Sequence, residues 1–333
     1  MQSLGISSIK PQAMPSVARS LTGTTKDLLT VASIPTRRLT RLLQKAHTLK
    51  KKHHSGRAFR PLIGKTLGLI FEKPSTRTRV SFEAGMNQLG GQALFLAAEN
   101  IQLSRGESLA DTAQVLSRYL DGLVIRTFDQ ATLEAWAQHA SIPVINGLTD
   151  QCHPCQALAD LLTISEKRGR LKGVKLAYIG DGNNIANSLI EAAARTGMHI
   201  TVGCPSGYEP DQKIVNWARE TSRDTGSKIE VTQDPLEAAT EADVLYTDVW
   251  ISMGQEHEHK RRLKALTPYQ LNERLLRVAK SSAVVMHCLP AHRGEEISES
   301  VLDGAQSVIL DQAENRLHMQ KAILIDWLGS SAS

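Results

Sequence analysis

Hydroxyl and guanidinium side chains gather in the stretch 75–79 (Ser-Thr-Arg-Thr-Arg), which follows a predicted buried strand at residues 67–70. Serine and threonine cap helix N-termini, where free N–H groups and the helix dipole favour an anion. The forked guanidiniums of Arg77 and Arg79 are expected at the same place, and they suit a phosphate or a carboxylate. A capped surface helix is the simpler interpretation, but cations in the first turn oppose the dipole unless an anion is bound. The stretch therefore predicts an anion-binding site.

A Cys-x-x-Cys pair, Cys152 and Cys155, lies between a predicted strand and a predicted helix. This placement is typical of a thiol redox motif. A zinc site completed by His287 or Cys288 is a second interpretation, although the sequence has no further close pair with zinc-finger spacing. The His-Glu-His run at 257–259 lies among charged residues and is interpreted as a solvated face.

The turn at 180–184 (Gly-Asp-Gly-Asn-Asn) starts like a dinucleotide-binding fingerprint, but Ile185 stands in place of the third glycine. A nicotinamide site is therefore disfavoured. His287 and Cys288 directly follow a predicted strand at 283–286. Because ligands bind at the carboxyl ends of strands in open α/β sheets, this imidazole and this thiol are well placed for chemistry.

Short apolar runs alternate with helical patterns along the chain, which predicts doubly wound parallel sheets with helices on both faces. Helices are expected between the strands, within residues 26–52 with an interruption at Pro35, and at 313–328. Strands are expected at residues 67–70, 93–96, 123–126, 143–146, 175–179, 199–202, 228–231, 244–246, 283–286 and 308–310.

The 333-residue chain is long enough for two α/β domains, and its 41% hydrophobic and 22% charged residues are typical of a globular protein. No apolar run approaches the ~20 residues needed to cross a bilayer, so no membrane association is expected. The net charge of +5 favours anionic partners, but 4% aromatics and scattered basic residues argue against nucleic acid. Four cysteines in a chain of this length predict a reducing, cytoplasmic location rather than a disulfide scaffold.

The first acidic residue is Asp27, so the N-terminal segment is polar and free of acids. A cleavable transit peptide shares this bias, but basic residues are few here and an amphipathic face is poor. A disordered tail over residues 1–22 is the preferred interpretation.

Several motifs together resemble one family, the aspartate and ornithine carbamoyltransferases, over residues 22 to 328. The run Lys-Pro-Ser-Thr-Arg-Thr-Arg at 73–79 resembles the carbamoyl phosphate signature. The run at 153–160 resembles the family's His-Pro-x-Gln-x-Leu-x-Asp segment, and the turn at 180–184 its Gly-Asp-x-x-Asn turn. At 287–290 the chain has His-Cys-Leu-Pro, as in the ornithine branch, where the aspartate branch has His-Pro-Leu-Pro. The run at 248–254 likewise resembles the Asp-x-x-x-Ser-Met-Gly loop of the ornithine branch.

This resemblance implies two α/β domains with the active site in the cleft between them. Residues 23–150 are expected to form a carbamoyl phosphate-binding domain and residues 151–312 an ornithine-binding domain, with a C-terminal helix at 313–330 packing back on the first. The implied reaction converts carbamoyl phosphate and L-ornithine into L-citrulline and phosphate, in arginine metabolism. No cofactor or metal is implied. The family's homotrimer, or a multiple of trimers, is the implied assembly.

The resemblance also implies roles for individual residues. Cys288, Arg126 and His153 are expected to be catalytic, with Cys288 as proton acceptor or ammonium partner, and Gln102 is the residue that a neighbouring subunit would insert. The ornithine site is expected to comprise Asn184, Asp248, Ser252 and Met253. The carbamoyl phosphate site is expected to comprise Ser75, Thr76, Arg77, Thr78, Gln102, Arg126, His153, Gln156, Cys288, Leu289 and Arg316.

Two competing interpretations remain at this stage. A carbamoyltransferase for putrescine or acetylornithine would need a different loop for the second substrate, and the run at 248–254 argues against both. A thiol-redox or basic binding protein would rest on Cys152, Cys155 and the positive net charge.

Overall fold

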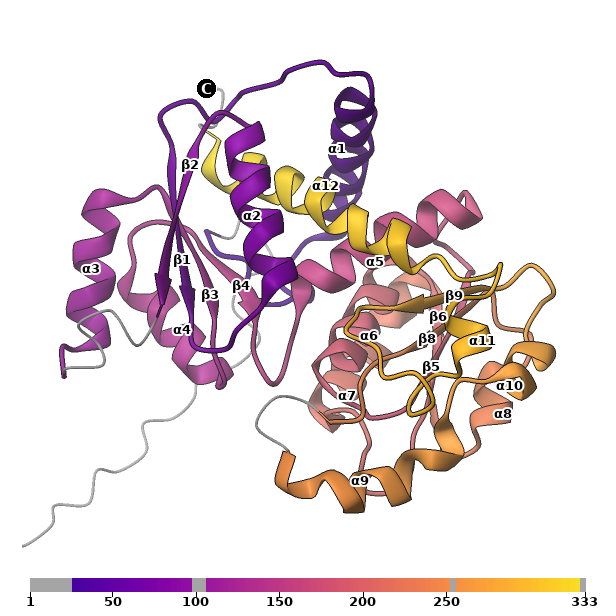
Figure 1. Cartoon of the computed structure of the whole chain (residues 1–333). Coiled ribbons are helices and arrows are strands. Elements are labelled where there is room, and N and C mark those ends of the chain that lie inside the picture. The colour runs from indigo at the N-terminus through magenta and orange to yellow at the C-terminus, as the bar shows by residue number, and fades with distance from the viewer. Residues whose placement is uncertain (1–25, 98–105, 252–255, 330–333) are drawn as a thin grey trace, which may run out of the picture.

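The structure, a computed structural model, describes residues 26–97, 106–251 and 256–329. Its strands form two separate parallel sheets, each covered by helices, and Figure 1 shows the two halves side by side. The predicted fold class, two doubly wound α/β units, is therefore confirmed. Within the described segments, none of the helices combines the length and the apolar character needed to span a bilayer.

In the first sheet the strands run parallel in the order β2-β1-β3-β4. Side chains alternate between the two faces, so Leu69 shares an apolar cluster with α1, α2 and α12, whereas Ile70 shares another with α3 and α4. The bounds are β1 Thr66–Phe71, β2 Gln92–Ala97, β3 Gly122–Arg126, β4 Val144–Leu148, α1 Thr36–His54, α2 Thr76–Gln88, α3 Leu109–Tyr119, α4 Gln130–His139 and α12 Ile309–Leu328.

The second sheet has the parallel order β7-β6-β5-β8-β9. Tyr178 on β5 shares an apolar cluster with α5, α6 and α7, and its neighbour Ile179 shares another with α8, α10 and α11. The bounds are β5 Lys175–Ile179, β6 His199–Gly203, β7 Ile229–Thr232, β8 Val244–Thr247, β9 Val284–His287, α5 Pro154–Arg168, α6 Asn184–Thr196, α7 Gln212–Thr225, α8 Pro235–Ala239, α9 His259–Leu266, α10 Glu273–Val278 and α11 Glu299–Leu302.

Helix α12 comes last in the chain but returns to pack on α1, α2 and α5, as Figure 1 shows. Met319 and Ile323 are buried in this contact. Near its end Asp326 accepts hydrogen bonds from Arg38 Nε at 2.7 Å and from Lys45 Nζ at 2.9 Å. The C-terminal helix thus closes back on the first half, as predicted.

Two predicted elements are wrong. Residues 308–310 are not a strand, because α12 begins at Ile309 and only Ser307 forms an isolated bridge, with Val285. The segment before Pro35 is not helical, because Leu28 pairs with the edge strand β4. Its N–H donates to Val144 O at 2.8 Å, and its carbonyl accepts from Asn146 N at 2.8 Å. The other predicted strands are found, with ends shifted by one or two residues.

A buried carboxylate, Glu191 on α6, ties the second half to the N-terminal segment of the first. Its Oε2 accepts the N–H of Ala32 at 3.0 Å. Burial raises the pKa of Glu191 from 4.5 to about 7, although backbone hydrogen bonds and Arg195 act in the opposite direction. Between these two pH values the folded chain keeps a proton that the unfolded chain has lost. Stability therefore falls as pH rises through this window.

We expect Glu191→Gln to remove this pH dependence, because an amide stays uncharged at every pH. The variant should gain stability relative to the parent as pH rises from 5 to 8, by up to about 3 kcal/mol. Thermal unfolding at a series of pH values measures the difference. Glu220→Gln, at an exposed position on α7, is the matched control. A pH-independent difference for Glu191→Gln would contradict the assignment.

Candidate active site

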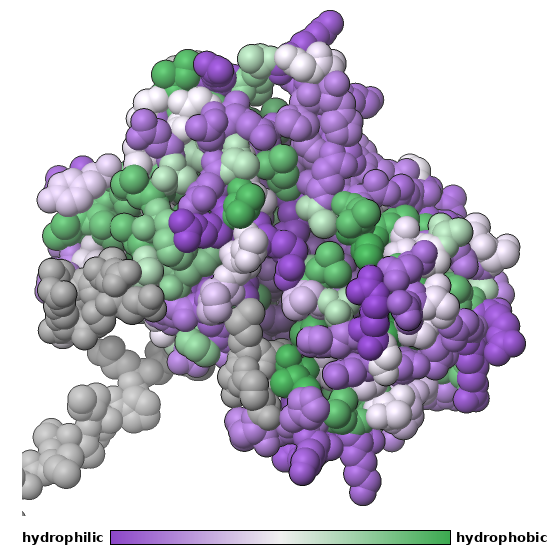
Figure 2. Space-filling view, viewed as in Figure 1, coloured by the Kyte–Doolittle hydropathy of each residue, from purple (hydrophilic) through white to green (hydrophobic). Residues whose placement is uncertain are grey.

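A cavity of about 630 Å³ opens between the two halves, at the carboxyl ends of strands from both sheets. Figure 2 shows the hollow between the halves with hydrophilic side chains along its border. Among the described residues, every member of the predicted site lines this cavity: Ser75, Thr76, Arg77, Thr78, Arg126, His153, Gln156, Asn184, Asp248, Cys288, Leu289 and Arg316. Gln102, Ser252 and Met253 lie outside the described residues.

The N-terminus of α2 points its first turn into the cavity. Ser75 is the N-cap in extended conformation, and its Oγ accepts the N–H of Thr78 at 3.3 Å. The buried Thr78 hydroxyl in turn accepts from Arg316 NH2 at 2.6 Å, which ties α12 to this end of α2. Arg79 does not belong to the site, contrary to the sequence prediction. Its guanidinium lies 3.7 Å from the centre of the Phe95 ring and bonds Glu83 at 2.9 Å.

Three arginines, Arg77, Arg126 and Arg316, converge on the cavity. Burial and the charges of Arg316 and Arg77 lower the pKa of Arg126 to about 10, so it stays cationic at neutral pH. The pKa of Arg316 is lowered by burial and by Arg77. Within the part of the chain that the structure describes, none of the three pairs with a carboxylate, and each has a buried Nε without a partner. Such a cluster is a preformed site for an anion.

His153 and Gln156 lie at the start of α5, next to the arginines. The backbone N–H of His153 donates to Ser188 Oγ at 2.8 Å, which fixes the start of the helix. Burial, together with the three arginine charges, holds the pKa of His153 well below its usual range, so the imidazole is neutral. His153 Nδ1 and Gln156 Oε1 are buried with no partner among the described residues. They remain available to a bound ligand.

A buried network centred on Asp160 holds Gln156 in place. Asp160 accepts from Gln156 Nε2 at 2.9 Å, from Gln312 Nε2 at 2.8 Å and from the Tyr246 hydroxyl at 3.0 Å. Burial raises the pKa of Asp160 to about 7, and the three hydrogen bonds oppose that rise. Gln312 also accepts the N–H of His287 at 2.9 Å. The network therefore joins the floor of the anion site to the end of β9.

The loop after β9 presents Cys288 and Leu289 to the cavity. His287 is buried and fixed on both sides: its Nε2 lies 3.1 Å from Glu296, and its Nδ1 accepts the N–H of Leu289 at 2.9 Å. Leu289 has a φ of +60°, an unusual backbone conformation for a non-glycine residue that is typical of functional loops. His287, held by Glu296, thus fixes the conformation of the loop that carries Cys288 and Leu289.

Asp248 is the acidic group of the cavity on the side of the second sheet. Its Oδ1 accepts from Cys288 Sγ at 2.9 Å, and its Oδ2 accepts from Asn183 Nδ2 at 2.8 Å. Burial and the neighbouring Asp248 charge raise the pKa of Cys288 well above its usual range, so the thiol carries its proton. Asn184 donates to Thr149 O at 2.7 Å. The cavity therefore has a cationic end and an anionic end.

Sequence reasoning missed several residues of the site. Asn183, which orients Asp248, also caps α6, and its place in the 180–184 turn was the available signal. Lys73 and Asp150 form an ion pair at the cavity, with Lys73 Nζ 4.1 Å from the centre of the Phe128 ring. Arg262, which does not line the cavity itself, donates to Trp250 O at 2.6 Å and pairs with Asp181. Lys73 and Asp181 lie in runs that the sequence analysis singled out, but their partners Asp150 and Arg262 are distant in sequence and no local pattern marks those.

The Cys152/Cys155 pair gives no sign of redox or metal chemistry. Both thiols are buried, and burial raises the pKa of Cys155 to about 12 and that of Cys152 well above its usual range. A redox thiol needs a lowered pKa. Among the described residues, neither cysteine belongs to a group with metal-ligand spacing. Asp248, His287 and Cys288 do form such a group, but both ring nitrogens of His287 bond groups outside it, Glu296 and the N–H of Leu289, and the raised pKa of Cys288 disfavours the thiolate that would bind a metal.

Comparisons with known proteins agree with this geometry. Residues 26–166 match the model described as "Aspartate/ornithine carbamoyltransferase, carbamoyl-P binding domain", and residues 172–326 match the "Asp/Orn binding domain" of the same family. The ornithine carbamoyltransferase of Anoxybacillus flavithermus is 56% identical over 303 residues, covering 91% of this chain and 96% of that protein.

Solved structures give the same result. The ornithine carbamoyltransferase structure from Pyrococcus furiosus matches with a TM-score of 0.89 and 51% identity, covering 91% of this chain and 97% of that one. The structure from Gloeobacter violaceus matches with a TM-score of 0.83 and 49% identity, covering 92% and 100%. The chain belongs to the aspartate/ornithine carbamoyltransferase family.

Proposed function

We propose that the protein transfers the carbamoyl group of carbamoyl phosphate to the δ-amine of L-ornithine, giving L-citrulline and phosphate, in arginine biosynthesis. The observation that carries this proposal is the cavity with three guanidiniums at one end, none of which pairs with a carboxylate among the described residues, and Asp248 at the other. The cationic end suits a phosphate, and the carboxylate suits the ammonium of an amino acid. The family and the names of the relatives above support the same reaction.

We assign the carbamoyl phosphate to the first domain, residues 23–150, and ornithine to the second, residues 151–312, with the helix at 313–330 on the first. The phosphate is held by the N-terminus of α2 and by Arg77, with Arg316 beside it. As the δ-amine attacks the carbonyl carbon, the carbonyl oxygen becomes an oxyanion. Thr78, Arg126 and His153 donate to that oxygen, and a neutral His153 does so without adding another charge. The C–O bond to the phosphate then breaks.

The δ-amine has an ordinary pKa of about 10, so it must lose a proton before it attacks. Cys288 is the proposed proton acceptor or ammonium partner. In the free protein its thiol donates to Asp248, whose charge is one cause of its raised pKa. An α-ammonium bound to Asp248 would neutralise that charge and compete for the same oxygen. Ornithine binding would therefore lower the pKa of the thiol, which would release its proton to solvent, and the resulting thiolate could then accept the proton that the δ-ammonium loses.

The proposal extends to the rest of the ornithine site and to the assembly. Ser252 and Met253 are proposed to complete the ornithine site, and Gln102 to enter the carbamoyl phosphate site of a neighbouring subunit in a homotrimer or a multiple of trimers. Exposed apolar side chains on α2, β2 and α3 support such an interface, and Figure 2 shows apolar atoms gathered over the side where β2 and α3 lie. These side chains are Val80, Leu94, Val115 and Tyr119. The proposed location is the cytoplasm, and residues 1–22, proposed as a disordered tail, lie outside the described residues.

Citrulline formation from purified protein tests the proposal. Carbamoyl phosphate is supplied with L-ornithine, acetylornithine, putrescine or L-aspartate in parallel, and the carbamoylated product and phosphate are both measured. The proposal requires ornithine to give the highest kcat/KM. Preference for another amine would contradict the substrate assignment, whereas absence of any carbamoyl transfer would contradict the reaction.

We expect Cys152→Ser to retain most of the citrulline synthesis, since this thiol does not line the cavity. Ser188 lies within hydrogen-bonding reach of the Cys152 side chain and can accept the new hydroxyl. Steady-state kinetics of the variant, with Cys155→Ser measured beside it, provide the test. If Cys152→Ser lost carbamoyl transfer and the parent showed disulfide reductase activity, the interpretation of Cys152 and Cys155 as a redox pair would stand again.

A further inference from the structure

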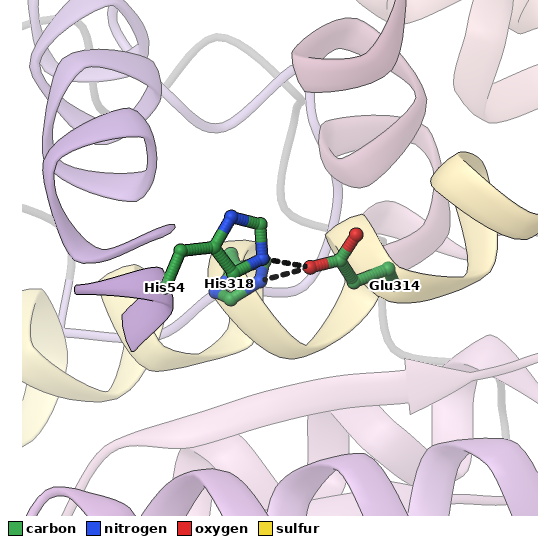
Figure 3. A group of neighbouring side chains, drawn as sticks. All are labelled: His54, Glu314 and His318. Atoms are coloured by element: carbon green, nitrogen blue, oxygen red, sulfur yellow. Dashed lines mark hydrogen bonds and ion pairs between the residues drawn. The ribbon is translucent and has the colours of Figure 1, made fainter. Parts of the chain in front are cut away.

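Two histidines and a glutamate meet where the end of α1 lies against α12, outside the active-site cavity. Figure 3 shows the rings of His54 and His318 both directed at one carboxylate oxygen of Glu314. His54 Nε2 lies 2.7 Å and His318 Nε2 lies 3.0 Å from Glu314 Oε1. A ligand atom from each of the three residues lies within 4.8 Å of those of the other two. From this cluster we propose a binding site for a divalent transition metal, with Zn²⁺ as the best-suited ion.

The ligand set fits this class of metal. Two imidazoles and a carboxylate suit Zn²⁺ and its first-row neighbours, whereas Mg²⁺ and Ca²⁺ prefer oxygen ligands alone. With Zn–ligand bonds of about 2.0–2.1 Å, tetrahedral ligand atoms lie about 3.3 Å apart. The N···O distances of 3.0 Å for His318 and 2.7 Å for His54 are shorter than this by about 0.3 and about 0.6 Å. The metal would therefore replace two hydrogen bonds as the two imidazoles move slightly apart from the carboxylate, and a water molecule would complete the tetrahedron.

The placement of the ligands on the helices is also suitable. Glu314 and His318 are four residues apart on α12 and so lie on one face, whereas Arg316 between them points to the opposite side and lines the cavity. His54 is the last residue of α1, where the helix dipole favours a cation. The ion would thus join the end of α1 to α12.

The proposed metal site is open to solvent on one side, and a neighbouring lysine opposes the bound cation. His318 is fully buried, whereas the side chains of His54 and Glu314 are 56% and 37% exposed, so an ion can enter from solvent. Lys50 Nζ lies 3.7 Å from Glu314 Oε2, and this positive charge opposes the ion. Lys50 also pairs with Glu166 at 3.0 Å, which offsets part of that repulsion.

Zinc titration calorimetry on the full-length chain tests the site, in a Cys288→Ser background that removes the thiol of the active-site group. We expect saturable uptake of one Zn²⁺ per chain at this cluster. His54→Asn or Glu314→Gln should weaken it at least tenfold, since even the loss of a hydrogen-bond partner behind a ligand typically costs about 10–100-fold. The matched control is His139→Asn, an exposed histidine at the end of α4.

Thermal unfolding gives a second measurement that does not depend on activity. Zn²⁺ that joins α1 to α12 should raise the unfolding temperature of the Cys288→Ser chain by mass action, and should not do so in the His54→Asn and Glu314→Gln variants. Co²⁺ in place of Zn²⁺ should give the visible spectrum of nitrogen and oxygen ligands without a thiolate band. Absence of saturable uptake, or uptake that His54→Asn leaves unchanged, would overturn the proposal.

Discussion

Replacing Arg126 with methionine is expected to lower the turnover of citrulline synthesis by about 100- to 1000-fold, the usual effect of removing one oxyanion donor. The same change should leave the unfolding temperature unchanged or higher. Arg126 is buried beside Arg77 and Arg316, and the charges of these two arginines lower its pKa to about 10. In the free protein the three cations repel one another, and methionine removes one of them while filling similar volume. Turnover should therefore fall without a loss of stability.

Arg79→Met is the matched control for this experiment. Arg79 belongs to the same motif as Arg77, but its guanidinium packs on Phe95 and pairs with Glu83, away from the cavity. Its loss should change turnover little. Steady-state kinetics and thermal unfolding of both variants give the comparison. Equal turnover in Arg126→Met and Arg79→Met would refute the role of Arg126, and a marked fall in its unfolding temperature would refute the repulsion argument.

The behaviour of Arg79 shows where sequence reasoning was too coarse. The motif predicted the N-terminus of α2 and its anion site, because a buried strand followed by helix-capping residues is a local signal. Residues two apart on a helix point in different directions, however, and here Arg77 lines the cavity whereas Arg79 packs on Phe95 and pairs with Glu83. The run at 73–79 thus predicted which residue types form the anion site, but only the helix geometry shows that Arg77, and not Arg79, belongs to it.

The residues that orient the site's side chains could not be predicted from local sequence patterns. Asp160 joins Gln156, Tyr246 and Gln312, which come from α5, β8 and α12, and only the packed tertiary structure brings them together. The strands were predicted well, since a buried parallel strand is a short apolar run bounded by turns. The failure at residues 308–310 has the same origin, because a short apolar run at the start of a helix looks identical.

The ornithine end of the cavity is tested by Asp248→Asn, which keeps the size and one acceptor but removes the charge. Asp248 is buried between Cys288 and Asn183, so an α-ammonium bound there would be shielded from water. Losing a charge-assisted hydrogen bond typically costs ~1.5–3 kcal/mol, or about ten- to over a hundred-fold in affinity. We expect that loss for ornithine added to the carbamoyl phosphate complex, with carbamoyl phosphate binding nearly unchanged.

Asp243→Asn is the control, because Asp243 comes just before the same strand β8 but pairs with Arg168 and Lys280 far from the cavity. It should affect stability rather than ornithine affinity. In Asp248→Asn the thiol of Cys288 also loses the neighbouring charge that helps to raise its pKa. The thiol should therefore titrate at lower pH in the variant than in the parent, measured by the rate of alkylation. Unaltered ornithine affinity in Asp248→Asn would show that Asp248 does not bind the α-ammonium. An unaltered thiol titration would show that the charge of Asp248 does not affect the pKa of Cys288.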